Sequence, residues 1–172
     1  KALILCEEAI KLDASMSLAY SLLAKICEWE LLQFTTEDSK KTLKDMLSYA
    51  KKAEELDSKN PIAAYGIARH YFFSGKFDQA KFYSERAIQL NPSYPDAQNI
   101  LGQSLVHSGN FIESEKHFLK AIELNPLDPN AILYKDGLYF AQMGLGNYET
   151  AYLLIEECIS QFSKAGFYKG FK

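Results

Sequence analysis

Apolar side chains recur along most of the chain at intervals of three and four residues, a spacing that places them on one face of an α-helix. In residues 1–12, leucine and isoleucine keep this spacing while lysine and glutamate occupy other positions. The same pattern returns at residues 17–33 and again at residues 148–163, where apolar residues cover much of the helix surface. The pattern predicts an all-α protein.

In the middle of the chain one sequence pattern occurs twice, with a period of 34 residues. Each copy opens with proline, has glycine near its middle, and has phenylalanine two residues after the glycine. A fixed period of this length is typical of repeat arrays, in which each unit is one supersecondary element packed on the next. The matched pairs are Pro61 and Pro95, Gly75 and Gly109, Phe77 and Phe111, Ala87 and Ala121, Leu90 and Leu124, and Pro92 and Pro126.

This pattern resembles the tetratricopeptide repeat, in which each unit is a pair of antiparallel helices, here named helix A and helix B. A small residue in helix A, a glycine between the helices, an aromatic residue after it, an alanine in helix B and a final proline carry the resemblance. In the first copy these are Ala68, Gly75, Phe77, Ala87 and Pro92. The resemblance implies a right-handed α-solenoid of about nine helices whose helices A line the concave side.

The rest of the chain fits the same array as irregular units. The unit that begins at Ser17 holds ten residues more than a standard repeat, and we expect both of its helices to be longer, with a short loop near Thr35. In the last unit Gly137 comes one residue late and Tyr148 three residues late, which predicts a longer or shifted helix A. The predicted units are 1–16 (helix B alone), 17–60, 61–94, 95–128, 129–164 and a tail at 165–172.

Both ends of the chain suggest further protein beyond them. The chain begins at Lys1 with an unpaired apolar helix, and a terminal helix of this kind normally needs a neighbour or a capping repeat. We therefore expect the chain to be part of a longer protein. Residues 165–172 contain three aromatic residues and two glycines, which leaves two alternatives open: packing over the last helix, or leading into a further repeat.

Composition narrows the class of partner. Apolar residues make up 48% of the chain, enough for a continuous core. Its net charge is −3, so we expect no basic surface that would attract nucleic acid or an anionic membrane. Three cysteines without zinc-binding spacing (Cys6, Cys27 and Cys158) predict reduced, structural thiols and a cytoplasmic location. No apolar run approaches the roughly 18 residues of a membrane span.

No motif for catalysis or metal binding is present. The histidines His70, His107 and His117 lack the i,i+4 spacing of paired metal ligands on one helix. Adjacent glutamates such as Glu156 and Glu157 diverge by about 100° around a helix, so they form no acid–base pair. Phosphate-binding loops, dinucleotide-binding fingerprints and calcium loops are missing as well. We expect no enzymatic activity and no cofactor.

The resemblance implies a set of ligand-binding residues, since helices A line the concave side in the family. The same inner positions include Glu28 and Asp96. In the last unit, where the glycine comes late, we expect Tyr134 to take an inner position. The candidate residues are Lys25, Trp29, Tyr65, Arg69, Phe72, Phe73, Asn99, Gln103, Val106, His107 and Tyr134.

These side chains suit an extended peptide. Amides such as Asn99 and Gln103 can satisfy a peptide backbone, and rings such as Tyr65 and Phe72 can hold its apolar side chains. Core packing of the phenylalanines and ordinary solvation of the polar groups remain alternatives. The chain does not match the set of lysine, asparagine and arginine residues with which some family members hold the carboxylate of chaperone tails.

The favoured function is a protein-interaction module that binds a peptide or partner protein on its concave surface. A homodimer formed through exposed terminal helices is a further expectation. The over-long unit followed by standard ones also resembles, more weakly, the arrays attached to bacterial winged-helix regulators or nucleotide cyclases. That resemblance implies a regulatory or oligomerisation segment as the alternative.

Overall fold

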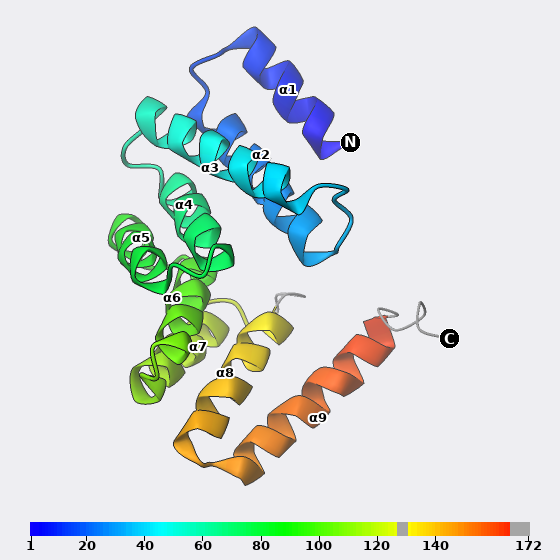
Figure 1. Cartoon of the computed structure of the whole chain (residues 1–172), viewed down its shortest axis with the longest axis vertical. Coiled ribbons are helices and arrows are strands. Elements are labelled where there is room, and N and C mark those ends of the chain that lie inside the picture. The colour runs from blue at the N-terminus through cyan, green and yellow to red at the C-terminus, as the bar shows by residue number, and fades with distance from the viewer. Residues whose placement is uncertain (127–130, 166–172) are drawn as a thin grey trace.

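The computed structural model describes residues 1–126 and 131–165, and every regular element within these ranges is an α-helix. The nine helices confirm the predicted all-α array (Figure 1). Four antiparallel pairs, α2/α3 to α8/α9, follow the single helix α1, which packs on α2. Their bounds are α1 Ala2–Leu12, α2 Ser17–Leu32, α3 Ser39–Leu56, α4 Pro61–Phe73, α5 Phe77–Leu90, α6 Pro95–His107, α7 Phe111–Leu124, α8 Ala131–Leu145 and α9 Tyr148–Ala165.

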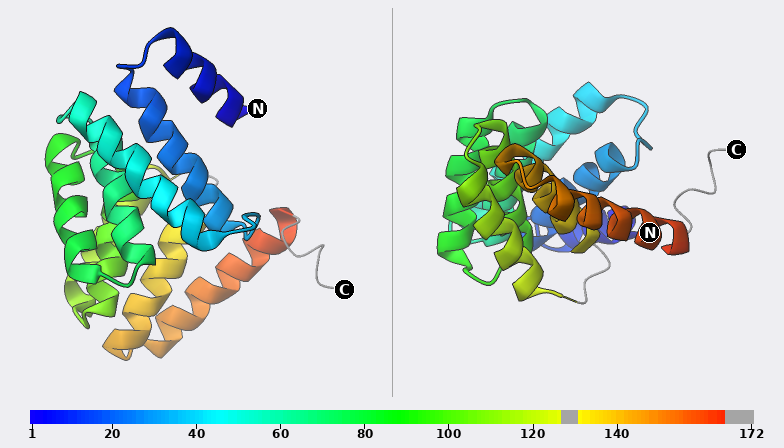
Figure 2. Two further views of the ribbon diagram at one scale, coloured as in Figure 1. Left: turned by 45° about the horizontal axis from the view of Figure 1, so that its top comes forward. Right: turned by 90° about the horizontal axis from the view of Figure 1, so that it is seen from below.

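The helix pairs stack along a curved path (Figures 1 and 2). Helix α2 contacts α4, α4 contacts α6, and α6 contacts α8. The second helices of the pairs, from α3 to α9, make no such contacts with one another within the described ranges. Because the first helices approach closely while the second helices spread apart, the array bends and α2, α4, α6 and α8 form its inner layer.

Three turns between paired helices use glycine in the left-handed conformation. Gly75, Gly109 and Gly146 have φ angles of 69°, 74° and 78°. In each case the next residue donates its backbone N–H to a carbonyl five residues earlier, for example from Lys76 to Tyr71 at 2.9 Å. Glycine is favoured here because it has no Cβ to penalise this conformation. The matching turns predicted at Gly75 and Gly109 are therefore present.

The long second unit distributes its extra residues over both helices and their loop. Helix α2 has 16 residues where α4 has 13, and α3 has 18 where α5 has 14. Asp38 caps α3 by accepting a hydrogen bond of 3.0 Å from the backbone N–H of Lys41. Asn60 caps α4 in the same way and also donates to Ser21 of α2 at 2.9 Å, which ties the second unit to the third.

The late glycine of the last unit makes room for a large ring in the core. Phe118 is fully buried, and its ring lies between Gly102 of α6 and Gly137 of α8. A Cβ atom would come within 2.8 Å of this ring at Gly102 and within 2.2 Å at Gly137. Both positions therefore require a residue without a side chain. The expected helix start at Pro129 and the tail at 166–172 lie outside the described residues.

Candidate functional site

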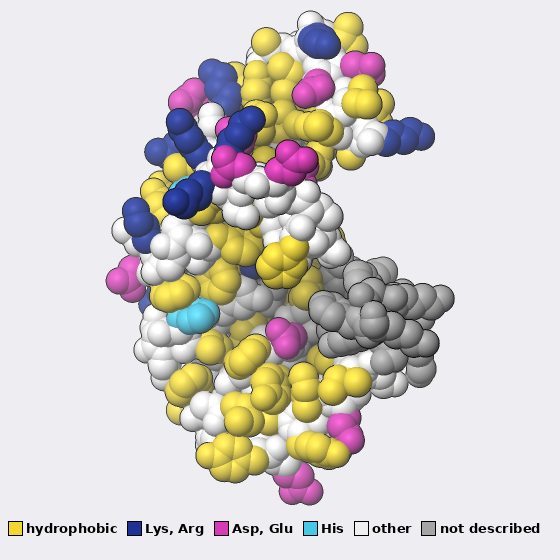
Figure 3. Space-filling view, turned by 45° about the vertical axis from the view of Figure 1, so that its right-hand side comes forward, with side chains coloured by type: hydrophobic (Ala, Val, Ile, Leu, Met, Phe, Trp, Pro, Cys, Tyr) yellow, Lys and Arg dark blue, Asp and Glu magenta, His cyan; other side chains and the backbone are white. Residues whose placement is uncertain are grey.

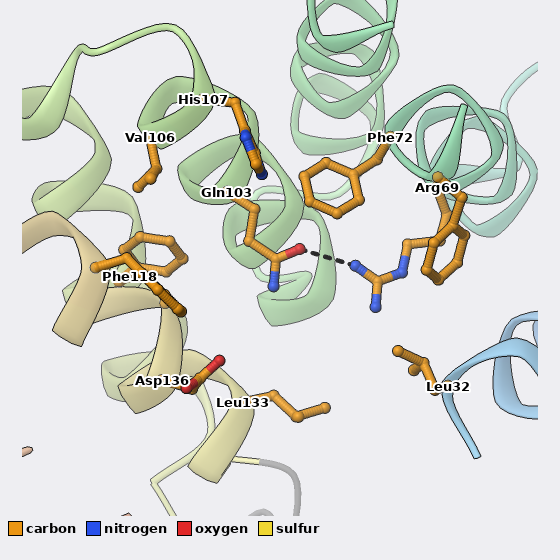
Figure 4. A pocket seen from close by; sticks show the side chains of 12 residues that line it. Leu32, Arg69, Phe72, Gln103, Val106, His107, Phe118, Leu133 and Asp136 are labelled. Carbon is orange, nitrogen blue, oxygen red and sulfur yellow. Dashed lines mark hydrogen bonds between the residues drawn. The ribbon is translucent and has the colours of Figure 1, made fainter. Parts of the chain in front are cut away.

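The inner layer of helices encloses two adjoining hollows. The large hollow has a volume of about 300 Å³ and the small hollow about 70 Å³, and both are lined by Leu32, Arg69 and Leu133. We call the two together the groove. Figure 3 shows a hollowed side of the molecule on which hydrophobic side chains gather. Figure 4 shows the large hollow from close by.

All eleven candidate residues from the sequence line the groove, because helix-A positions of successive units face the same side. Trp29 is 41% exposed at the edge, whereas others among them are almost fully buried. Arg69, Phe72, Phe73, Gln103, Val106 and His107 line the large hollow, and Lys25, Trp29, Tyr65, Asn99 and Tyr134 line the small one.

Glu28 and Arg69 form a buried ion pair between α2 and α4. Glu28 Oε1 lies 2.7 Å from Arg69 Nε and accepts a hydrogen bond of 2.6 Å from the Tyr65 hydroxyl. Arg69 Nη1 donates to Gln103 Oε1 at 2.9 Å, the dashed line in Figure 4. Since Glu28 and Arg69 are only 6% and 4% exposed, the guanidinium is held on two sides by the protein itself.

A second ion pair crosses a longer stretch of the array. Lys25 Nζ on α2 lies 2.8 Å from Asp96 Oδ2 on α6. The other oxygen of Asp96 accepts a hydrogen bond of 2.9 Å from the hydroxyl of Tyr134 on α8. The ammonium of Lys25 also lies 5.4 Å from the ring centre of Tyr65. Asp96 therefore connects three helices of the inner layer.

Burial changes the proton affinities of this network. Burial raises the pKa of the Tyr65 hydroxyl well above its usual value, and the charge of Glu28 raises it further. Burial disfavours the charge on Arg69, but nearby Glu28 outweighs it and holds the pKa of the guanidinium above its usual value. Tyr65 and Arg69 thus keep their protons at neutral pH and can both donate to Glu28.

Two of the polar candidate residues are buried. Ordinary solvation was an alternative left open for the polar candidate residues, but Arg69 and Asn99 are only 4% and 5% exposed. The reason is that neighbouring inner helices converge on them. Asn99 Oδ1 is a buried acceptor that finds no hydrogen-bond partner among the described residues, so it can accept a hydrogen bond from a bound molecule.

Phe72 and Phe73 both pack in the core and line the large hollow, so core packing does not remove them from the groove. Phe72 packs against the cluster around Tyr65 and Ile100, and Phe73 against the cluster around Ile67. Each is half-buried. Their rings therefore present a firm apolar wall to the hollow.

The rim of the large hollow carries exposed rings. His107 stacks on Phe77 with 4.1 Å between ring centres and meets Phe72 edge-on at 5.4 Å. Phe140 on α8 is 51% exposed. These rings are accessible to a bound molecule and lie beside an apolar wall.

Besides Gly137, sequence reasoning missed five residues that line the large hollow. Three belong to α8, where the late glycine obscured the register. Counting the inner positions from Pro129, as the two matched repeats are counted from Pro61 and Pro95, gives two of them, Leu133 and Phe140. Phe118 was not predicted because it comes from a helix B and enters between two glycines. The missed residues are Leu32, Phe118, Leu133, Asp136 and Phe140.

Asp136 is the most distinctive of these residues. Burial raises the pKa of its carboxyl group above the usual value. Figure 4 shows Asp136 beside Leu133, across the large hollow from Phe72 and Arg69. It forms no hydrogen bond or ion pair with any residue that the structure describes.

The described part of the chain offers little for catalysis or metal binding. No cluster of three or more histidine, cysteine, aspartate or glutamate side chains that could hold a metal ion occurs within it. The three cysteines are buried and free, and burial raises the pKa of the Cys27 thiol to about 11, which opposes thiolate formation. No helix within residues 1–126 and 131–165 is both long and apolar enough to cross a membrane.

Comparison with known proteins identifies the repeat. The sequence model of the tetratricopeptide repeat matches residues 63–94 and 95–126. A search of curated protein sequences found no match.

Solved structures share the fold. A crystal structure of MamA is 20% identical, with a TM-score of 0.63 over 96% of this chain and 90% of its own. TTC0263, a thermophilic tetratricopeptide-repeat protein of Thermus thermophilus, is 21% identical, with a TM-score of 0.64 over 79% of this chain and 71% of its own. The first such domain of Spaghetti (RPAP3), solved with the HSP90 peptide SRMEEVD, is 20% identical, with a TM-score of 0.58 over 74% of this chain and 93% of its own.

At such identities the likeness concerns the fold alone. It agrees with the two matched repeats, the helix pairs and the glycine turns of this chain. The chain therefore carries tetratricopeptide repeats and folds as an all-α tetratricopeptide-repeat solenoid.

Proposed function

We propose that this chain binds a peptide segment of a partner protein in the groove. The tetratricopeptide-repeat fold in general supports protein–protein interaction. The observation that carries the finer proposal is the large hollow, about 300 Å³ in volume, walled by rings and opening beside polar groups of the inner layer. This volume is at the lower end of the range for ligand pockets, and it suits one or two large side chains of a peptide.

The contacts available in the groove match what a peptide needs. Phe72 and Phe140 offer apolar contact at the wall and the rim, and the buried Asn99 Oδ1 offers an acceptor to a backbone N–H. An apolar centre surrounded by polar groups is typical of protein interfaces. A domain of the same fold, Spaghetti (RPAP3), was solved with a bound peptide.

The test compares a groove variant with a variant elsewhere. Peptides are selected by display on the immobilised protein, and their affinities are then measured by fluorescence anisotropy. We expect Phe140→Ala to weaken binding by about tenfold, because truncating an aromatic anchor commonly costs about 1–2 kcal/mol or more. Tyr152→Ala, which removes a similarly exposed ring on α9, should leave affinity unchanged. The reverse result would place the binding surface on α9.

A second candidate function rests on exposed apolar residues at both ends of the array. Leu153 and Ile159 of α9 are 60% and 51% exposed, and Ile4 and Leu5 of α1 are 57% and 56% exposed. Such faces can associate with another copy, as in a regulatory or oligomerisation segment of a larger bacterial signalling protein. Sedimentation velocity tests this: a dimer of the chain that Leu153→Asp converts to a monomer would support it, and a monomer at all concentrations would refute it.

The proposal includes three further statements. The chain itself performs no catalysis and needs no cofactor, its partner is a protein and not nucleic acid, and it works in the cytoplasm, where free thiols such as Cys27 stay reduced. An assay of purified protein for bound nucleic acid by absorbance ratio checks the second statement.

A further inference from the structure

The charges that line the groove do not balance. Two cationic side chains, Lys25 and Arg69, and three carboxylates, Glu28, Asp96 and Asp136, line the two hollows. Arg69 pairs with Glu28 and Lys25 pairs with Asp96, at 2.7 and 2.8 Å. Asp136 has no such partner within the described ranges. Among the described lysine, arginine and carboxylate groups that line the groove, one negative charge is therefore unpaired.

The position of Asp136 makes this charge available to a bound molecule. The residue is half-buried and lines the large hollow together with the apolar residues Leu133 and Phe140 of the same helix. A carboxylate in such surroundings is poorly solvated, so it gains more from a cationic partner than a carboxylate in water would.

The groups that could instead attract an acidic ligand are already engaged. Arg69 is held by Glu28 and Gln103, and Lys25 is held by Asp96. An acidic peptide would have to displace one of these contacts, which would leave a buried carboxylate without a partner. The Asn99 oxygen that lacks a partner is also an acceptor. The groups of the groove that lack a partner would therefore bind a hydrogen-bond donor or a cation.

We propose that the groove selects peptides carrying a lysine or arginine next to a large apolar side chain. The apolar side chain packs against Phe72 and Phe73 in the large hollow, and the cation pairs with Asp136. This inference rests on the proposed peptide-binding function and goes further by naming the chemistry of the peptide. The rings at the rim favour the same choice, since a cation is attracted to the face of an aromatic ring.

An oriented peptide library tests the selection. Acetylated and amidated nonapeptides with a fixed central leucine and all other positions randomised are passed over the immobilised protein, and the retained pool is sequenced. We expect lysine and arginine to be enriched about tenfold over aspartate and glutamate next to the leucine, the ratio for one partly buried charge pair. Asp136→Asn should reduce this ratio to about twofold or less, while selection for apolar residues persists.

A matched control variant distinguishes an effect of Asp136 itself from an effect of the protein's net charge. Glu149→Gln removes one negative charge from the exposed start of α9 and should leave the enrichment unchanged. For one selected peptide, exchange of its lysine for glutamine should cost about tenfold in affinity against the wild type and less than about twofold against Asp136→Asn.

The outcomes distinguish this inference from the function on which it rests. Retained peptides without a basic preference, or with a preference that survives Asp136→Asn, overturn the inference and leave groove binding intact. Retention that Phe140→Ala does not weaken overturns groove binding itself. Retention that appears only when the chain is shortened to end at Ala165 would identify residues 166–172, which include Lys169, as the occupant and overturn the assignment to a partner.

Discussion

Phe34 adopts the left-handed backbone conformation that glycine adopts in the other three turns within helix pairs. It follows α2, its φ is 53°, and its side chain is 92% exposed. The backbone N–H of Thr35 donates to the carbonyl of Glu30 at 3.0 Å, the same bond that follows Gly75 and the other two turn glycines. A residue with a Cβ is strained in this conformation, and no burial of the ring offsets the cost.

Phe34→Gly should therefore raise the free energy of unfolding by about 1 kcal/mol, the usual penalty for a side chain in the left-handed region. Urea unfolding followed by circular dichroism measures it. Gly75→Ala is the converse variant. No atom lies within 4 Å of the added Cβ, so a loss of stability in this variant would come from backbone strain and not from a steric clash. An unchanged midpoint for Phe34→Gly would show that the turn carries no strain.

Asp136 makes stability depend on pH in a direction opposite to that of most carboxylates. Burial raises the pKa of its carboxyl group in the folded chain, so the folded state favours the protonated form. Its contribution to stability is fully present below the unfolded pKa, near 3.8, and is lost as the pH rises through the higher folded pKa.

Asp136→Asn should consequently increase the denaturant midpoint at pH 7 and have little effect at pH 3. Paired unfolding curves at the two pH values check this, with Glu149→Gln as the exposed control. An equal effect of Asp136→Asn at both pH values would mean that the charge of the carboxylate is not the cause.

At the scale of elements, the Glu28–Arg69 pair joins α2 to α4. Both side chains are buried, so removing one partner leaves a charge without compensation inside the protein. Gln103 of α6 would lose its donor at the same time. Arg69 thus links α4 to both α2 and α6.

Arg69→Met alone should lower the free energy of unfolding by about 3–5 kcal/mol, as for other broken buried pairs. Adding Glu28→Gln should recover part of that loss, because the buried charge is then gone. Chemical denaturation of the two single variants and the double variant gives the coupling. Additive losses would contradict a direct interaction between the two side chains.

At the scale of the whole molecule, Asp96 connects units that are not neighbours in the array. Repeat proteins are normally stabilised by contacts between adjacent units. Here Lys25 of the long unit reaches Asp96 across the unit between them, and Tyr134 of the last unit donates to the same carboxylate. The inner layer is therefore linked along the groove as well as from one unit to the next.

Asp96→Asn should loosen distant helices together. Hydrogen–deuterium exchange monitored by mass spectrometry is expected to speed up in α2 and α8 as well as in α6. Exchange that changes only in α6 would show that each unit responds alone. Glu123→Gln, on the exposed side of α7, serves as the variant that should change none of them.

The repeat period was enough to predict much of the fold. Spacing by 34 residues placed the helix pairs and the turns at Gly75 and Gly109, because these depend on local pattern and backbone preference. The same register assigned the candidate residues to the inner helices. It failed to distinguish exposed positions such as Trp29 from buried ones such as Arg69, because a helix face does not show how closely the next helix approaches.

The amino-acid sequence by itself determined the all-α repeat, the order of its units and the residues that share the inner side, since all three follow from periodicity. Only the tertiary structure decided which charges pair, and hence that Asp136 has no cation among the described residues. Lys25 and Asp96 are 71 residues apart, and their meeting depends on the curvature that accumulates over several stacked units. That curvature comes from the packing of side chains between helices, such as Phe118 between Gly102 and Gly137.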